Sequence, residues 1–196
     1  MPQTSQTISD VIDEVFALLQ HSGGEEYFGE AISKLQHAEQ CAYQAQQAGG
    51  DEELILASLL HDIGHLLDVE GTIRDERVGV VNHDEIGQQW LEAHGFSKRV
   101  AALVGGHVDA KRYLTAVNPN YLARLSPASI ETLRLQGGPM DSATAAQFAE
   151  VPELRDILRL RSWDEMAKDP EWKGPNLESY RDMLTRHLAA QAAAAN

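Results

Sequence analysis

The sequence predicts an all-α protein that forms a single helical domain. Apolar residues recur at the three- and four-residue spacing of a helix along most of the chain, and no segment shows the strict alternation of a half-buried strand. A length of 196 residues suits one domain of ordinary size. We expect this domain to cover residues 1–196, with its core at about 8–190 and a frayed, Ala-rich tail at 191–196.

The N-terminal part of the chain contains three predicted helices. The first covers Ile8–Gln20, whose apolar residues fall on one stripe. The second runs from about Glu30 to Ala48 and ends before a pair of glycines, which is a common C-terminal signal. The third begins after Asp51, a good helix cap, and is apolar on most sides. We therefore expect it to be the buried central helix, which leads directly into His61-Asp62.

The C-terminal part contains further helices separated by glycine, proline and capping residues. Ser126 followed by Pro127 predicts a capped helix start that opens Ala128–Leu135, because proline is favoured at the first helical position. The other helices are expected at His83–His94, Ser97–Gly105, His107–Thr115, Ser142–Glu150, Pro152–Ala167 and Leu177–Ala190.

Composition and charge narrow the class of partner. The formal net charge of −14 disfavours nucleic acid, because binding a phosphate backbone relies on lysine and arginine. No apolar run approaches the roughly 20 residues that a membrane span needs, so no membrane partner is expected. A single cysteine, Cys41, excludes an intramolecular disulfide framework and predicts a cytoplasmic protein in which this residue packs in the core. Any metal must then rely on histidine and carboxylate.

The pair His61-Asp62 suggests a metal site. It directly follows the buried apolar helix, where an unpaired carboxylate would be strongly unfavourable. A bound cation removes that cost, since it neutralises the carboxylate and uses the imidazole lone pair. Of the eight histidines, we expect His21, His94 and His187 to be ordinary helix-end or surface residues.

Six ligand-type side chains have the spacing of a known metal site. They are His37, His61, Asp62, His83, His107 and Asp164. The pattern resembles the metal signature of the HD-domain superfamily, in which a histidine precedes the HD pair and an aspartate follows far downstream. The resemblance implies that His37, His61 and Asp164 bind one metal ion. It also implies that His83 and His107 bind a second ion and that Asp62 bridges the two ions.

A second pattern lies one helical turn from these ligands. His65 follows His61 by four residues, Lys111 follows His107 by four, and Arg161 precedes Asp164 by three, so each pair shares a helix face. The hydroxyls of Ser129 and Thr132 form another same-face pair at the start of a helix. Two cations, two hydroxyls and a helix N-terminus predict an oxyanion pocket for phosphate or phosphonate.

The whole arrangement resembles the PhnZ-type oxygenases, mixed-valent di-iron HD proteins whose mechanism is related to that of myo-inositol oxygenase. Tyr27 and Glu30 match the Tyr-x-x-Glu element of that family. The resemblance implies an Fe(II)/Fe(III) pair that uses O2 to cleave the C–P bond of 2-amino-1-hydroxyethylphosphonate, or an N-methylated analogue. The products would be glycine, or its N-methylated analogue, and inorganic phosphate.

The resemblance also implies roles for the residues around the metals. The tyrosine would occupy an iron position until substrate displaces it, and the glutamate would face the substrate amine. The catalytic residues implied are Tyr27, Glu30, His65 and Lys111. The substrate-binding residues implied are Tyr27, Glu30, His65, Lys111, Ser129, Thr132 and Arg161.

Two other functions fit parts of the same pattern. HD domains also act as metal-dependent phosphohydrolases on nucleotides or small phosphate esters, with a metal-activated water as nucleophile. A catalytically inert helical sensor is the third possibility. The number of N-methyl groups on the substrate amine stays open, because Tyr27 and Phe28 supply two aromatic rings that would suit a trimethylated amine. The sequence leaves the stereochemistry of the substrate and the oligomeric state open as well.

Overall fold

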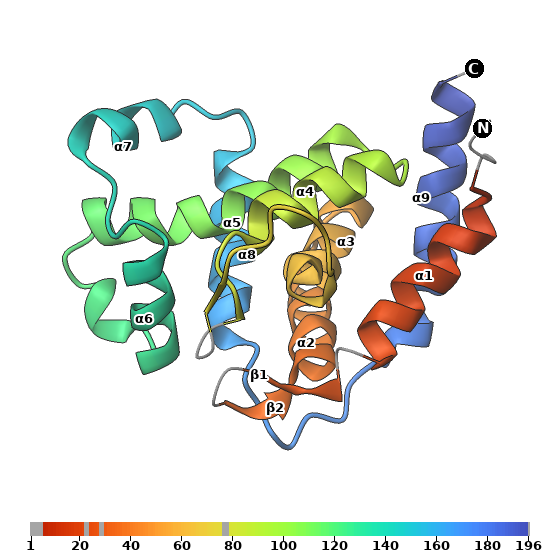
Figure 1. The fold of residues 1–196 in the computed structure, drawn as a ribbon, viewed down its shortest axis with the longest axis horizontal. Coiled ribbons are helices and arrows are strands. Elements are labelled where there is room, and N and C mark those ends of the chain that lie inside the picture. Colours follow the sequence, from red (N-terminus) through yellow and green to blue (C-terminus); the bar gives the residue numbers. More distant parts are fainter. Residues whose placement is uncertain (1–5, 22–23, 28–29, 76–78, 196) are drawn as a thin grey trace.

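The computed structural model describes residues 6–21, 24–27, 30–75 and 79–195 (Figure 1). Its described residues are mainly helical, which confirms the all-α class. The helices are α1 Ile8–His21, α2 Lys34–Gln47, α3 Glu52–Leu60, α4 His83–Ala93, α5 Lys98–Val117, α6 Pro127–Leu135, α7 Ser142–Phe148, α8 Leu154–Met166 and α9 Arg181–Ala194. Short 3₁₀ turns lie at Ile63–Leu66, Leu122–Arg124 and Leu177–Tyr180. None of the described helices has the length and hydropathy of a transmembrane span.

Two small antiparallel hairpins were not predicted. Strand β1, Glu26–Tyr27, pairs with β2, Glu30–Ser33, and β3, Arg74–Asp75, pairs with β4, Gly79–Val80. The expected start of the second helix at Glu30 is therefore wrong, since α2 begins only at Lys34. Ser33 fixes this start, because its hydroxyl accepts from the Gln36 amide while the Gln36 side chain accepts from the Ser33 amide.

Helix α5 is continuous, although the sequence predicted two helices that separate at its Gly105-Gly106 pair. These glycines allow close packing. A β-carbon at Gly105 would overlap the side chain of Gln88, and one at Gly106 would lie 2.7 Å from the side chain of Ile157. The two glycines thus let α4 and α8 approach α5 from different sides.

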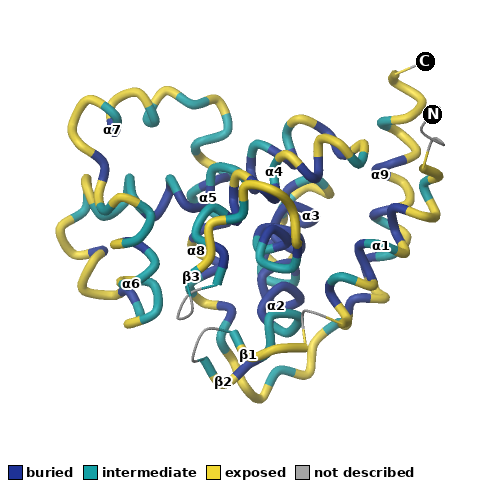
Figure 2. Tube along the Cα trace, in the orientation of Figure 1, coloured by how far each residue is buried: buried dark blue, intermediate teal, exposed yellow. Residues whose placement is uncertain are grey.

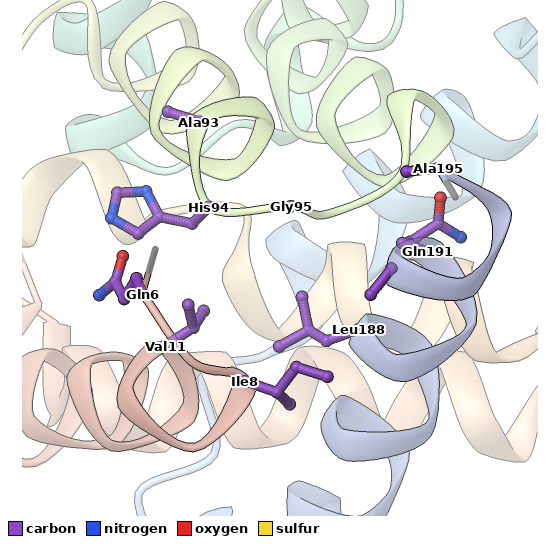
Figure 3. A pocket seen from close by; sticks show the side chains of 10 residues that line it. Gln6, Ile8, Val11, Ala93, His94, Gly95, Leu188, Gln191 and Ala195 are labelled. Atoms are coloured by element: carbon purple, nitrogen blue, oxygen red, sulfur yellow. The ribbon is translucent and has the colours of Figure 1, made fainter. Parts of the chain in front are cut away.

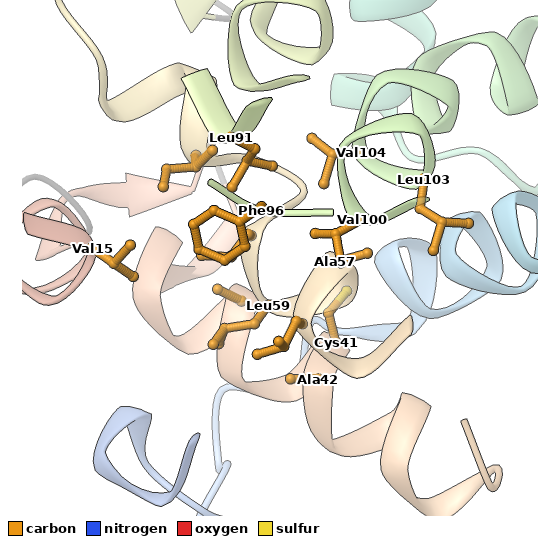
Figure 4. Packing of buried hydrophobic residues seen from close by; sticks show 14 of the residues in the cluster. Val15, Cys41, Ala42, Ala57, Leu59, Leu91, Phe96, Val100, Leu103 and Val104 are labelled. Atoms are coloured by element: carbon orange, nitrogen blue, oxygen red, sulfur yellow. The ribbon is translucent and has the colours of Figure 1, made fainter. Parts of the chain in front are cut away.

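The core is centred on α3, as the sequence predicted. Leu54, Leu56 and Leu60 are fully buried, and α3 packs against α2, α5 and α8. Figure 2 shows the buried residues concentrated along α2 and α3 in the middle of the molecule. In Figure 4, side chains from α1 to α5 point toward one another, and Cys41 lies among them in the core as expected.

The remaining helices flank this centre on opposite sides (Figure 1). Helices α1 and α9 pack together on one side, while α6 and α7 lie on the other. Helix α9 continues through the Ala-rich tail to Ala194. The expectation that His187 is a surface residue is wrong, because its side chain is buried and its Nε2 accepts a hydrogen bond from the Ser97 amide.

Candidate metal centre and substrate pocket

Five helical segments bring the six ligand-type side chains to one place. Helix α2 carries His37, and His61 and Asp62 follow the last residue of α3. Helix α4 begins with His83. His107 lies in the middle of α5 and Asp164 near the end of α8. The four imidazoles and Asp164 are at least nine-tenths buried, so the cluster lies inside the protein.

The Asp62 carboxylate lies between two groups of ligand-type atoms. Its Oδ2 is 3.8 Å from His37 Nε2 and 3.5 Å from His61 Nε2. Its Oδ1 is 3.3 Å from His83 Nε2 and 3.6 Å from His107 Nε2.

The outer carboxylate belongs to the first of these groups. Asp164 Oδ1 lies 3.3 Å from His37 Nε2 and 3.9 Å from His61 Nε2. The Asp62 carboxylate can therefore bind two neighbouring cations, whereas the Asp164 carboxylate lies on the side of His37 and His61.

Each of the four imidazoles is oriented by a backbone carbonyl. Nδ1 lies 2.9 Å from a carbonyl oxygen in His37, His61 and His83, and 2.6 Å in His107. Because a carbonyl can only accept, Nδ1 carries the proton in each neutral ring and Nε2 keeps its lone pair. This is how proteins commonly fix the tautomer of metal-binding histidines. All four Nε2 atoms point into the cluster.

The cluster fits a pair of cations. Asp62 Oδ2 is buried and has no hydrogen-bond partner among the described residues, which is costly for a carboxylate unless a cation compensates it. His37 Nε2 and His61 Nε2 are 3.1 Å apart, so two nitrogens with free lone pairs face each other. The donors are imidazole nitrogens and carboxylate oxygens, which suit iron or manganese and give no preference for copper(I).

The electrostatics of the cluster favour the metal-binding protonation states of Asp62, His61 and His83. Burial raises the pKa of Asp62, but the neighbouring imidazoles outweigh it and the pKa lies well below its usual range. Burial lowers the pKa of His83 to about 4 and also lowers the pKa of His61. The carboxylate is therefore ionised and these two imidazoles are neutral near pH 7.

Gly64 explains how His83 reaches the cluster. It follows His61 by three residues and Asp62 by two, and a β-carbon there would overlap the backbone carbonyl of His83. Only a residue without a side chain allows the first turn of α4 to lie directly on the 3₁₀ turn that begins at Ile63. Gly64, two residues after the HD pair, thus positions a ligand-type side chain from another helix.

A small polar pocket opens beside the cluster. It has about 40 Å³ of free space, and its lining includes Asp62, His83, His107 and Asp164. Six of the seven predicted substrate-binding residues also line it: Tyr27, His65, Lys111, Ser129, Thr132 and Arg161. A larger groove of about 450 Å³ between α1, α9 and the end of α4 is lined mainly by apolar residues and shares none of these side chains (Figure 3). The polar pocket is therefore the candidate substrate site.

Two buried cations supply positive charge to this pocket. Lys111 Nζ donates to Thr132 Oγ1 at 2.7 Å, and burial together with the charge of Arg161 lowers the pKa of Lys111 to about 7. Arg161 Nη1 donates to Asp164 Oδ2 at 2.5 Å, which holds the guanidinium next to the metal cluster. Its Nη2 is buried and has no hydrogen-bond partner among the described residues. That donor is suited to bind an anion.

Tyr27 ends strand β1 and Glu30 begins strand β2. The Tyr27 ring stacks on the His37 imidazole at a centroid distance of 3.9 Å and lines the pocket. Glu30 is not among the pocket-lining residues, because its Oε1 is held by Lys168 Nζ at 2.6 Å. Phe28 lies outside the described residues.

Lys168 is a pocket residue that the sequence analysis missed. It lines the pocket next to Arg161 and Asp164, just after the end of α8. The only sequence signal is its position four residues after Asp164, which is the spacing that drew attention to His65 and Lys111. A lone lysine after a helix gives no further indication of an internal role.

Comparisons with known proteins identify the family of this chain. The HD domain family model matches residues 35–141, so the chain belongs to the HD-domain family. The chain is 37% identical over 177 residues to the [1-hydroxy-2-(trimethylamino)ethyl]phosphonate dioxygenase (glycine-betaine-forming) of Leisingera caerulea, with 90% of each chain covered. It is 38% identical over 180 residues to the hydroxymethylphosphonate dioxygenase of Gimesia maris, covering 90% of this chain and 87% of the relative.

A third relative is an uncharacterized protein of Acanthamoeba polyphaga mimivirus, which is 34% identical over 190 residues, 96% of this chain and 85% of the relative. The matches to the two dioxygenases extend over nearly the whole length of each protein. Within the HD-domain family, the chain therefore belongs with the phosphonate dioxygenases, which are oxidoreductases.

Proposed function

We propose that this protein is a di-iron oxygenase that uses O2 to cleave the C–P bond of a small 1-hydroxyphosphonate. We take 2-amino-1-hydroxyethylphosphonate, or an N-methylated analogue, as its substrate. The observation that carries the proposal is the position of Asp62 between two imidazole pairs, directly beside a pocket with two buried cations. The relatives named as phosphonate dioxygenases support the same reaction.

The six clustered side chains would hold the two irons. His37, His61 and Asp164 would bind one ion, His83 and His107 would bind the other, and Asp62 would bridge them. Nitrogen and oxygen donors suit iron, and we propose a mixed-valent Fe(II)/Fe(III) pair. When bound, this pair supplies the activation of O2 and the redox chemistry.

The protein's own residues would bind and orient the substrate. Lys111 and the unpartnered Nη2 of Arg161 would neutralise the phosphonate, with hydrogen bonds from His65, Ser129 and Thr132. Tyr27, stacked on His37, would cover the cluster and exclude water until substrate displaces its hydroxyl. Glu30 would pair with the substrate ammonium. His65, Lys111, Tyr27 and Glu30 would thus touch the substrate during the reaction.

The proposed reaction balances without another co-reactant. One molecule of 2-amino-1-hydroxyethylphosphonate and one O2 contain the atoms of one glycine and one phosphate. The C–P bond breaks, carbon gains one oxygen to become the carboxyl group, and phosphorus gains one oxygen to become phosphate. The substrate supplies the four electrons that reduce O2.

The size of the pocket favours a small substrate over a nucleotide. Its free space of about 40 Å³ is far below the roughly 300 Å³ at which pockets for drug-sized ligands begin. A nucleotide phosphohydrolase would need room for a base and a sugar. Among phosphohydrolase substrates, the pocket therefore favours a small phosphate ester over a nucleotide.

Oxygen consumption tests the proposal. The iron-loaded protein should consume one O2 for each glycine and each phosphate formed from the aminophosphonate, and it should form neither product under argon. Phosphate release from small esters under argon would instead identify a hydrolase. An electron paramagnetic resonance signal that changes when substrate is added should accompany the oxygenase reaction. If the iron-loaded protein consumes no O2 with any 1-hydroxyphosphonate, the proposal is wrong.

A further inference from the structure

Lys168 links the β1–β2 hairpin to helix α6 beside the pocket, through an ion pair with Glu30 and a hydrogen bond to Ser126. Lys168 Nζ lies 2.6 Å from Glu30 Oε1 and donates to Ser126 Oγ at 3.1 Å. The lysine and glutamate side chains are 19% and 24% exposed, so the pair is mostly shielded from solvent. Ser126 is the N-cap of α6, the helix that carries Ser129 and Thr132. A single ammonium group therefore connects β2 with the helix that supplies the pocket hydroxyls.

Lys168 lies on the pocket side of this pair. It lines the polar pocket, whereas Glu30 lines a separate, outward-facing groove with other residues of β2. The carboxylate of Glu30 consequently meets the pocket through the lysine ammonium. A cation inside the pocket can reach that carboxylate only by competing with Lys168.

The charge balance of the pocket makes this competition important. Lys111 and Arg161 already supply positive charge for the phosphonate group. A substrate with an ammonium group brings a further positive charge, for which Glu30 is the partner under the proposed function. Lys168 neutralises that partner in the structure. A substrate without a cationic group leaves the ion pair intact.

We propose that Lys168 sets the charge selectivity of the substrate pocket, because it is an internal counter-ion of Glu30 that the cationic substituent of a substrate must displace. This inference rests on the proposed function and extends it to the choice between cationic and uncharged hydroxyphosphonates. Lys168 is thus a specificity-determining residue. It disfavours an ammonium group and does not act on the phosphonate.

The test measures binding without turnover. Ethylphosphonate and 2-aminoethylphosphonate differ by one amino group, and both lack the hydroxyl at C1. Their dissociation constants are measured by calorimetry under argon on the iron-loaded protein. In Lys168→Met, which keeps an unbranched apolar side chain, the preference for 2-aminoethylphosphonate over ethylphosphonate should rise about tenfold, because a hydrogen-bonded charge pair no longer has to be broken.

Two further variants separate this effect from general changes in charge or packing. Lys98→Met removes the same charge from an exposed lysine at the start of α5 and should leave the preference unchanged. Lys168→Gln can still donate to Ser126, and it should raise the preference as Lys168→Met does, provided that circular dichroism shows a folded protein. Adding Glu30→Gln to Lys168→Met should abolish the gain.

Three results would overturn the inference. Equal weakening of both ligands in Lys168→Met would show that Lys168 binds the phosphonate, and unchanged binding of both ligands would show that it has no role in selectivity. An equal rise in preference in Lys98→Met would reduce the effect to net charge. A selectivity change in a protein that consumes no O2 would instead support the inference while refuting the oxygenase proposal.

Discussion

Replacing Gly64 by alanine should remove the second metal ion without unfolding the protein. The new β-carbon would lie 2.7 Å from the carbonyl carbon of His83 and still closer to its oxygen. Real β-carbons essentially never come within 3.0 Å of another heavy atom, and the His83 oxygen is the nearer of the two atoms, so the backbone at His83 must move by at least about 1 Å. No rotation of a side chain can relieve this overlap, because the nearest atoms all belong to the backbone.

The size of the effect follows from this displacement. Metal–ligand distances tolerate about 0.2 Å, so a shift of at least about 1 Å should lower the affinity of the site that contains His83 by about tenfold to a hundredfold. Overpacking of this kind costs about 1–3 kcal/mol, which corresponds to a decrease in Tm of roughly 2–12 °C for a domain of this size. The site that contains His37 and His61 should keep its ion.

Two measurements check this prediction. Inductively coupled plasma mass spectrometry should find about one iron per chain in Gly64→Ala and, under the proposed function, two in the unmodified protein. Circular dichroism should find an unchanged helix content. Gly24→Ala is the matched control, since the methyl group that it adds would have no atom within 4 Å other than those of its chain neighbours. Two irons and an unchanged Tm in Gly64→Ala would refute the reasoning.

Three other predictions concern the cluster and the pocket. Asp62→Ala should abolish iron loading, because both ions lose a ligand, and a normal iron content would show that the bridging role is misassigned. Tyr27→Phe keeps the ring on His37 but lacks the hydroxyl. It should therefore change substrate affinity or the resting iron spectrum while both metals stay bound. Identical spectra and kinetics would show that the Tyr27 hydroxyl does not occupy an iron position before substrate binds. The pKa of Lys111, lowered to about 7 by burial and by Arg161, means that its ammonium is lost as the pH rises through 7. The kcat/KM for the phosphonate should therefore fall between pH 6 and 8. This fall should be absent in Lys111→Arg, because the arginine side chain stays charged. If both proteins show the same fall, the titrating group is not Lys111.

The helical framework was predictable where local sequence determines it. The start of α6 follows from the Ser126 cap and Pro127, and the central position of α3 follows from its continuous apolar sequence. The continuity of α5 was not predictable, because a Gly-Gly pair has the same local appearance at a helix end and at a close helix crossing. Tertiary packing by Gln88 and Ile157 decides between the two.

The residues of the cluster and pocket were also predictable only in part. The residues of the cluster could be selected because the adjacent pair His61-Asp62 follows a buried apolar helix and because the other ligand-type residues match the spacing of the HD-domain signature. The pairing of Lys168 with Glu30 could not, because these residues are 138 positions apart and only the fold brings them together. Strands β1, Glu26–Tyr27, and β3, Arg74–Asp75, have two residues each and are also too short to show any periodicity.

The ligand-type residues come from segments that begin with α2 and end with α8, which has a consequence for biosynthesis. No contiguous fragment that stops before Asp164 contains the full set, so a nascent chain cannot complete the centre until Asp164 has left the ribosome. Under the proposed function, iron capture would then follow the synthesis of α8. The bound ions would act as cross-links between helices made at different times, and the iron content of a preparation would report how many molecules have finished folding.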